Sequence, residues 1–170
     1  MALIDSAGQI LDDRWTYPDC EGDGKVGPNF VLSIESLTAW GAEPPAISPL
    51  GAYVGEGTTA DEVAPFLDRV DLVVVAFPKF RDGRGFTVAR TLREKYGFKG
   101  DIRAIGHVLP DQLAALVRCG FSTIVTPREH PPSQWAFNAA SKDESASAGP
   151  LLRRLIAKRA TQEEDVDEAE

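Results

Sequence analysis

The sequence predicts an α/β protein with a mostly parallel sheet of four or more strands and flanking helices. Between residues 50 and 126, short runs of β-branched and aromatic residues alternate with segments whose apolar residues recur every three or four positions. Glycine, proline and capping residues separate these segments. Connections long enough to hold a helix force neighbouring strands into parallel pairing through right-handed crossovers. An open sheet and part of a barrel both fit this alternation.

The strands are predicted from short apolar runs bounded by turn residues. The run at 72–77 is continuous in apolar character, which is typical of a strand buried on both faces. Similar shorter runs predict three more strands, at 50–54, 102–106 and 122–126.

The helices are predicted from their start and stop signals. Thr59 and Glu62 form a capping box, so a helix should begin there, and Pro65 inside it predicts that it is short or irregular. A second helix is expected at 86–96, where apolar residues are three and four positions apart. A third is expected at 110–120, between a first-turn proline and a terminal glycine.

The first fifty residues predict a less regular arrangement. A hairpin is expected at 3–11, where short apolar runs flank an Asp-Ser-Ala-Gly turn. Residues 20–28 are rich in glycine and charge and are expected to form a loop. A strand at 30–32 should then lead into a short helix capped by Ser33.

One folded domain is expected in this chain of 170 residues. The expected divisions are an α/β domain at 1–138, a flexible polar linker at 139–150, a short amphipathic helix at 151–160 and a disordered acidic tail at 161–170.

Composition and charge argue against several classes of protein. The last eight residues hold six of the 26 acidic side chains, so the rest of the chain has 20 acidic and 18 basic residues, a net charge of −2. A nearly neutral body argues against nucleic-acid binding, which needs a basic face. No signal-like or membrane-spanning run occurs, so we expect a cytoplasmic protein without a membrane partner. The two cysteines are far apart, and we expect no metal site.

The loop after the apolar run 72–77 is the main candidate site. It ends a predicted parallel strand, and ligands of α/β proteins bind at the carboxyl ends of such strands. Its glycines would let the backbone approach a ligand, and its cations would bind an anion beside the following helix N-terminus. The proposed anion-binding residues are Lys79, Arg81, Gly83, Arg84 and Gly85.

A structural interpretation of the same loop remains open. Asp82 and Gly83 are common turn formers, and Arg84 could simply pair with Asp82. Asp82 and His107 are the candidate catalytic residues, since both follow predicted strands at the same edge and the imidazole titrates near neutral pH. His107 could equally be a turn residue. The glycine spacing matches neither a dinucleotide fingerprint nor a Walker motif, so no cofactor is expected.

Between residues 71 and 121 the sequence holds a series of short motifs: Phe77-Pro78-Lys79-Phe80, Asp82-Gly83-Arg84-Gly85, Ala89-Arg90, Leu92-Arg93, Gly100, Arg103-Ala104, Gly106, Val108-Leu109, Asp111-Gln112 and Arg118-Cys119-Gly120-Phe121. With these motifs the sequence resembles DUF934, a bacterial family of unknown function. Members are commonly labelled oxidoreductases involved in sulfite reduction and are encoded beside sulfite reductase genes.

The resemblance implies an accessory protein of assimilatory sulfite reduction, with sulfite reductase or another sulfate-assimilation enzyme as its partner. It leaves open whether the chain is itself an oxidoreductase component. The cationic loop agrees with this role, because sulfite is an anion. The alternative is a stand-alone enzyme that acts on a phosphorylated or sulfated small molecule at the carboxyl edge of the sheet.

Overall fold

The computed structural model of the chain describes residues 1–17, 27–40, 47–79 and 81–135. The predicted linker at 139–150, the helix at 151–160 and the acidic tail at 161–170 lie outside the described residues. So do most of the loop expected at 20–28 and the last three residues of the domain expected at 1–138.

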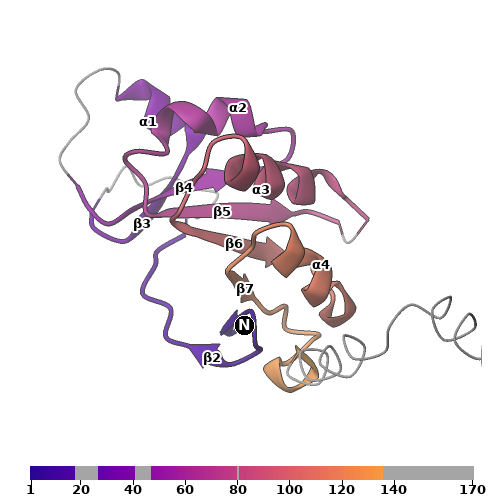
Figure 1. Cartoon of the computed structure of the whole chain (residues 1–170). Helices are drawn as coiled ribbons and strands as arrows, with labels where there is room; N and C mark the ends of the chain where they lie inside the picture. Colours follow the sequence, from indigo (N-terminus) through magenta and orange to yellow (C-terminus); the bar gives the residue numbers. More distant parts are fainter. Residues whose placement is uncertain (18–26, 41–46, 80, 136–170) are drawn as a thin grey trace, which may run out of the picture.

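The described chain forms an open seven-stranded sheet in the order β2-β1-β7-β6-β5-β4-β3 (Figure 1). Strands β3 to β7 are parallel, whereas β1 is antiparallel to both β2 and β7. The strands are β1 (Leu3–Asp5), β2 (Ile10–Leu11), β3 (Phe30–Ser33), β4 (Leu50–Val54), β5 (Leu72–Phe77), β6 (Asp101–Gly106) and β7 (Thr123–Val125). The predicted α/β class with a mostly parallel sheet is therefore confirmed. An open sheet and part of a barrel were the two predicted alternatives, and the described strands form an open sheet.

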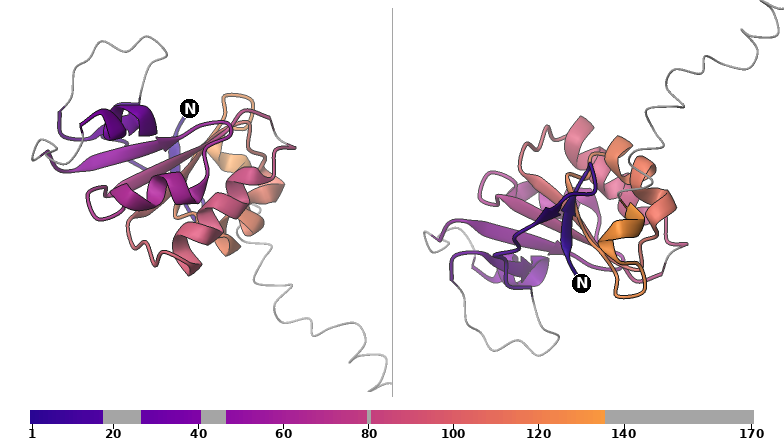
Figure 2. Two further views of the ribbon diagram at one scale, coloured as in Figure 1. Left: turned by 90° about the horizontal axis from the view of Figure 1, so that it is seen from above. Right: turned by 90° about the horizontal axis from the view of Figure 1, so that it is seen from below.

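The helices pack on one face of this sheet (Figures 1 and 2). Because β3 to β7 follow one another in both sequence and space, right-handed crossovers place every connection on the same side. The helices are α1 (Ile34–Ala39), α2 (Ala60–Val63), α3 (Arg84–Glu94) and α4 (Leu113–Arg118), with 3₁₀ turns at Ala64–Phe66 and Pro110–Gln112. Their apolar residues join the alternate residues of the strands in one large core.

The opposite face has a smaller core beneath an N-terminal strap, residues 12–17. The strap runs from β2 to the other end of the sheet, where the Thr16 N–H donates to Asn29 O at 2.8 Å and the Val31 N–H donates to Thr16 O at 2.9 Å. Val31, Leu72 and Val74 are buried on this face. Strand β5 is therefore covered on both sides, as its apolar run predicts.

Local signals explain several element boundaries. The Glu62 carboxylate accepts a hydrogen bond from the Thr59 N–H at 2.7 Å, which confirms the predicted capping box. Pro65 converts the rest of that helix into a 3₁₀ turn. Helix α3 begins two residues earlier than its apolar stripe predicts, with Gly83 as its N-cap, and the Asp82 carboxylate accepts a hydrogen bond from the Arg84 N–H in its first turn.

Candidate functional site

The carboxyl edge of the parallel strands brings together loops from distant parts of the chain. The chain leaves β5 at Phe77 and enters α3 at Arg84, and the loop after β4 lies beside it. On the other side, the His107 N–H donates to Phe77 O at 2.8 Å, which fixes the start of the loop after β6 against the end of β5. The predicted site residues therefore gather at one edge, but they separate into two hollows.

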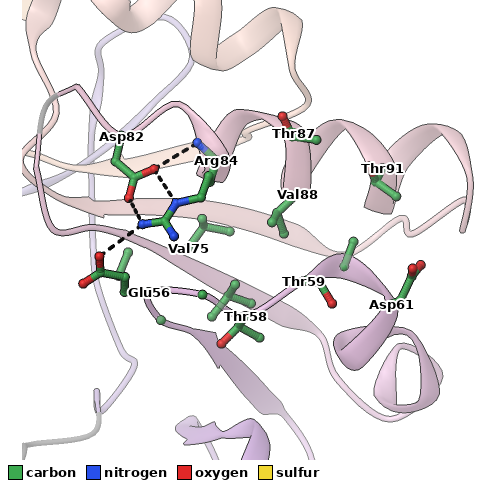
Figure 3. A pocket seen from close by; sticks show the side chains of 16 residues that line it. Glu56, Thr58, Thr59, Asp61, Val75, Asp82, Arg84, Thr87, Val88 and Thr91 are labelled. Carbon is green, nitrogen blue, oxygen red and sulfur yellow. Dashed lines mark hydrogen bonds and ion pairs between the residues drawn. The ribbon is translucent and has the colours of Figure 1, made fainter.

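Arg84 lies in the first hollow and is held by two carboxylates (Figure 3). Its Nη2 donates to Asp82 Oδ2 at 2.6 Å and to Glu56 Oε1 at 3.1 Å, and its Nε donates to Asp82 Oδ1 at 2.9 Å. The side-chain bonds from Arg84 to Asp82, together with that from the Arg84 N–H, lower the pKa of Asp82 to about 2. The pairing of Arg84 with Asp82, one of the two interpretations of this loop, is thus what the structure shows. The charge of Arg84 is compensated, although the side chain is 61% exposed.

Lys79 and Arg81 lie in a second hollow, which they form with Pro78 and His107. Its volume is about 430 Å³, and the described residues of its lining include two basic side chains, a histidine and no carboxylate. The side chains of Lys79, Arg81 and His107 are all exposed. Two of the three cations of this loop therefore lie on the β6 side.

The two glycines of the loop have different environments. An added Cβ at Gly85 would lie 2.7 Å from Phe77 Cζ and 3.1 Å from Val75 Cγ1, so this glycine lets α3 pack closely on β5. An added Cβ at Gly83 meets nothing within 4 Å, and its φ of −78° is accessible to any residue. The close approach that the structure shows is thus between helix and strand. A role of either glycine in anion binding stays a prediction.

The first hollow is a cavity of about 350 Å³ between α2 and α3. Figure 3 shows Val75 and Val88 in its middle, the cluster of Asp82, Arg84 and Glu56 at one end, and Asp61 at the other. Threonine side chains complete the wall, namely Thr58, Thr59, Thr87 and Thr91. This mixture of an apolar middle and polar ends is typical of a small-molecule site.

A buried arginine on the sheet face beneath the strap was not predicted from the sequence. Arg103 is 4% exposed and donates to Thr123 Oγ1, Asp13 Oδ1, the Tyr17 hydroxyl and Asp101 Oδ2 at 2.8 to 3.0 Å. Burial raises the pKa of Tyr17 above its ordinary value, and its hydrogen bond to Asp13 adds to the effect. The network fastens the strap to the sheet. Strand alternation could have placed Arg103 opposite Ile102 and Ala104, but nothing local identifies its partners.

A second arginine, for which no role was predicted from the sequence, connects α3 to the amino ends of β6 and β7. Arg93 donates to Gly120 O at 2.9 Å, Phe98 O at 2.7 Å, Gly100 O at 2.8 Å and Ser122 Oγ at 2.8 Å. It satisfies backbone carbonyls where the chain enters β6 and β7, so its role is to hold α3 on the sheet.

The described residues contain neither a group of metal-binding side chains nor a membrane-spanning helix. Among residues 1–17, 27–40, 47–79 and 81–135, no three His, Cys, Asp or Glu side chains are grouped so that they could hold a metal ion. Within this described part of the chain, no helix has both the length and the apolar character needed to cross a membrane.

These features define an α/β protein with an open sheet, helices on one face and two hollows at the carboxyl edge. The model of the family described as "Bacterial protein of unknown function (DUF934)" matches residues 51–145, more than half of the chain. The protein belongs to this family, as the sequence resemblance predicts. A search of curated proteins found no match.

Proposed function

We propose that the protein is an accessory component of assimilatory sulfite reduction that binds an anion or a reductase partner through the loop after β5. The observation that carries this proposal is the second hollow, where the described lining consists of Pro78, Lys79, Arg81 and His107. The role in sulfite reduction comes from the label that members of the family commonly bear. We further propose a cytoplasmic location and sulfite reductase as the partner.

Electrostatics favours the Lys79 side of the loop as the place where the anion or the reductase partner binds. Two exposed cations and a histidine around an open hollow raise the local concentration of an anion and steer an acidic protein surface toward it. On the other side, Arg84 is paired with Asp82 and Glu56, so an anion there would meet two carboxylates beside the guanidinium. The alternative, an enzyme acting on a phosphorylated or sulfated small molecule beside Arg84, is therefore less well supported.

The experiment compares two charge reversals on opposite edges of the sheet. The double variant Lys79→Glu, Arg81→Glu should weaken capture of sulfite reductase from the native cell, or sulfite binding in a calorimetric titration, by about tenfold or more. The double variant Lys99→Glu, Arg118→Glu is the matched control, because both residues are exposed and lie at the amino edge, before β6 and at the end of α4. Unchanged binding by the double variant, or normal growth on sulfate and sulfite after deletion of the gene, would contradict the proposal.

A further inference from the structure

The two edges of the sheet differ in whether another segment covers them. At the β3 edge the strap lies along the outer strand, because the Thr16 N–H donates to Asn29 O at 2.8 Å and the Val31 N–H donates to Thr16 O at 2.9 Å. At the other edge, β2 pairs only with β1 among the described strands. An edge strand presents unpaired N–H and C=O groups, so this open edge can accept a further strand.

The backbone hydrogen bonds of the hairpin show which residue of β2 faces the open edge. The Asp5 N–H donates to Gln9 O at 3.0 Å, so these two residues form a hydrogen-bonded pair. Bonded and non-bonded pairs alternate along an antiparallel ladder, so the next pair, Ile4 and Ile10, exchanges no hydrogen bonds. The N–H and C=O of Ile10 therefore point away from β1, toward the open edge.

The side chains at this edge are apolar, whereas edge strands are commonly protected by charge. Met1 is 82% exposed, Ile10 67% and Leu11 40%, and these three are the exposed large apolar side chains among the described residues. All of them lie in the N-terminal hairpin or directly before it. Exposed apolar side chains gathered at an open strand edge indicate a contact surface for another strand.

We propose that β2 pairs with β2 of a second copy of this chain, antiparallel and centred on Ile10, so that the two sheets join into one. A register centred on Leu11 would put Ile10 opposite Asp12, and a register centred on Asp12 would put two carboxylates opposite each other. Centring on Ile10 avoids both and brings two apolar side chains together. The strap blocks a head-to-tail contact between β2 and β3 of the next copy, so the pairing closes as a two-fold dimer.

The dimer goes beyond the accessory role and uses different residues, so either proposal can fail while the other stands. Strands β1, β7 and β6 separate β2 from β5, so the pairing leaves the Lys79 hollow of each copy open. An interface built on so short a strand belongs to the small and weak class of protein interfaces. We therefore expect a dissociation constant of about 10–100 µM.

The test measures the mass of the full chain by sedimentation equilibrium between about 5 and 500 µM, on either side of the expected dissociation constant. Ile10→Pro removes the outward N–H, which β1 does not bond, and keeps an apolar side chain at a position where proline is tolerated. Ile10→Lys places a charge at the centre of the interface. Each variant should weaken dimerisation by about tenfold or more. Thr16→Lys is the control, because it places the same charge on an exposed residue at the β3 edge, and it should leave dimerisation unchanged.

Hydrogen exchange reports the strand pairing itself. In the wild-type chain the Ile10 amide should exchange more slowly as the protein concentration rises, because its N–H becomes bonded in the dimer. Urea unfolding shows whether each variant is folded, and if Ile10→Pro is not, Ile10→Lys and the amide exchange still decide. A monomer at about 500 µM, unchanged dimerisation in a folded Ile10→Pro or Ile10→Lys variant, or Ile10 exchange that is independent of concentration would each overturn the proposal.

Discussion

Replacing Gly85 with alanine should destabilise the protein by forcing α3 away from β5. The new Cβ would lie 2.7 and 2.8 Å from two carbons of the Phe77 ring, well inside an ordinary contact of 3.4–4 Å. The ring cannot turn aside freely, because Phe77 is 1% exposed and its centroid is 5.3 Å from that of Phe86 and 5.8 Å from that of Phe121. Overpacking of this kind costs about 1–3 kcal/mol, and the gain in helix propensity offsets at most about 1 kcal/mol of it. We therefore expect a net loss of about 1–2 kcal/mol.

Gly83→Ala is the control for this prediction, since it makes the same chemical change two residues earlier. Its Cβ meets nothing and its φ is allowed, but Gly83 is the N-cap of α3, where alanine is disfavoured. This cost opposes the gain of about 0.4–1 kcal/mol from the reduced freedom of the unfolded chain, so we expect a change smaller than about 0.5 kcal/mol. Urea unfolding at equilibrium, extrapolated to water, measures both changes. For a chain of this size, each kcal/mol corresponds to about 2–4 °C in Tm. Equal stabilities of the two variants would refute the reasoning, because the packing of α3 on β5 would then not depend on the missing Cβ.

Two further predictions concern the charged networks. Arg103→Ala should reduce the free energy of unfolding by about 3 kcal/mol, toward the low end for a broken buried ion pair because Asp13 and Asp101 are partly exposed and can be rehydrated. In this variant the Thr16 amide should also exchange its hydrogen faster. If the free energy of unfolding falls by less than about 1 kcal/mol, the network does not hold the strap. The carboxyl of Asp82 should titrate near pH 2 by NMR, and Arg84→Ala should raise its pKa toward the ordinary value of about 3.9. Because the pKa of Asp82 is lower in the folded than in the unfolded protein, the stability that this carboxylate contributes is present above about pH 3.9 and is lost as the pH falls through about 2. An unchanged pKa of Asp82 in Arg84→Ala would contradict Arg84 as the cause of the shift.

The parallel part of the sheet could be predicted because its signals are local. Strands β4 and β5 have the predicted bounds, since each is an apolar run between turn residues. The N-terminal hairpin was also predicted from its turn. The position of this hairpin in the sheet was not predicted. Strand β1 pairs with β7, with Ile4 opposite Ile124, and a pairing between residues so far apart leaves no local pattern in the sequence.

The candidate site could be predicted in position but not in charge. The rule that loops gather at the carboxyl ends of parallel strands places Lys79, Arg84 and His107 at one edge. The partner that decides the character of Arg84 is Glu56, which is 28 residues away and belongs to a different loop. A short cationic sequence therefore predicts a cationic site only when the neighbouring loop contributes no carboxylate.

The loop between β5 and α3 thus contributes to two hollows with different electrostatic character. The separation arises from chain direction: Lys79 and Arg81 lie beside the β6 loop and His107, whereas Asp82 and Arg84 lie beside the β4 loop and Glu56. The hollow beside Glu56 has no comparable excess of positive charge, because Arg84 is already paired with Asp82 and Glu56. Salt screens exposed charges, so anion binding at the Lys79 hollow should weaken as ionic strength rises.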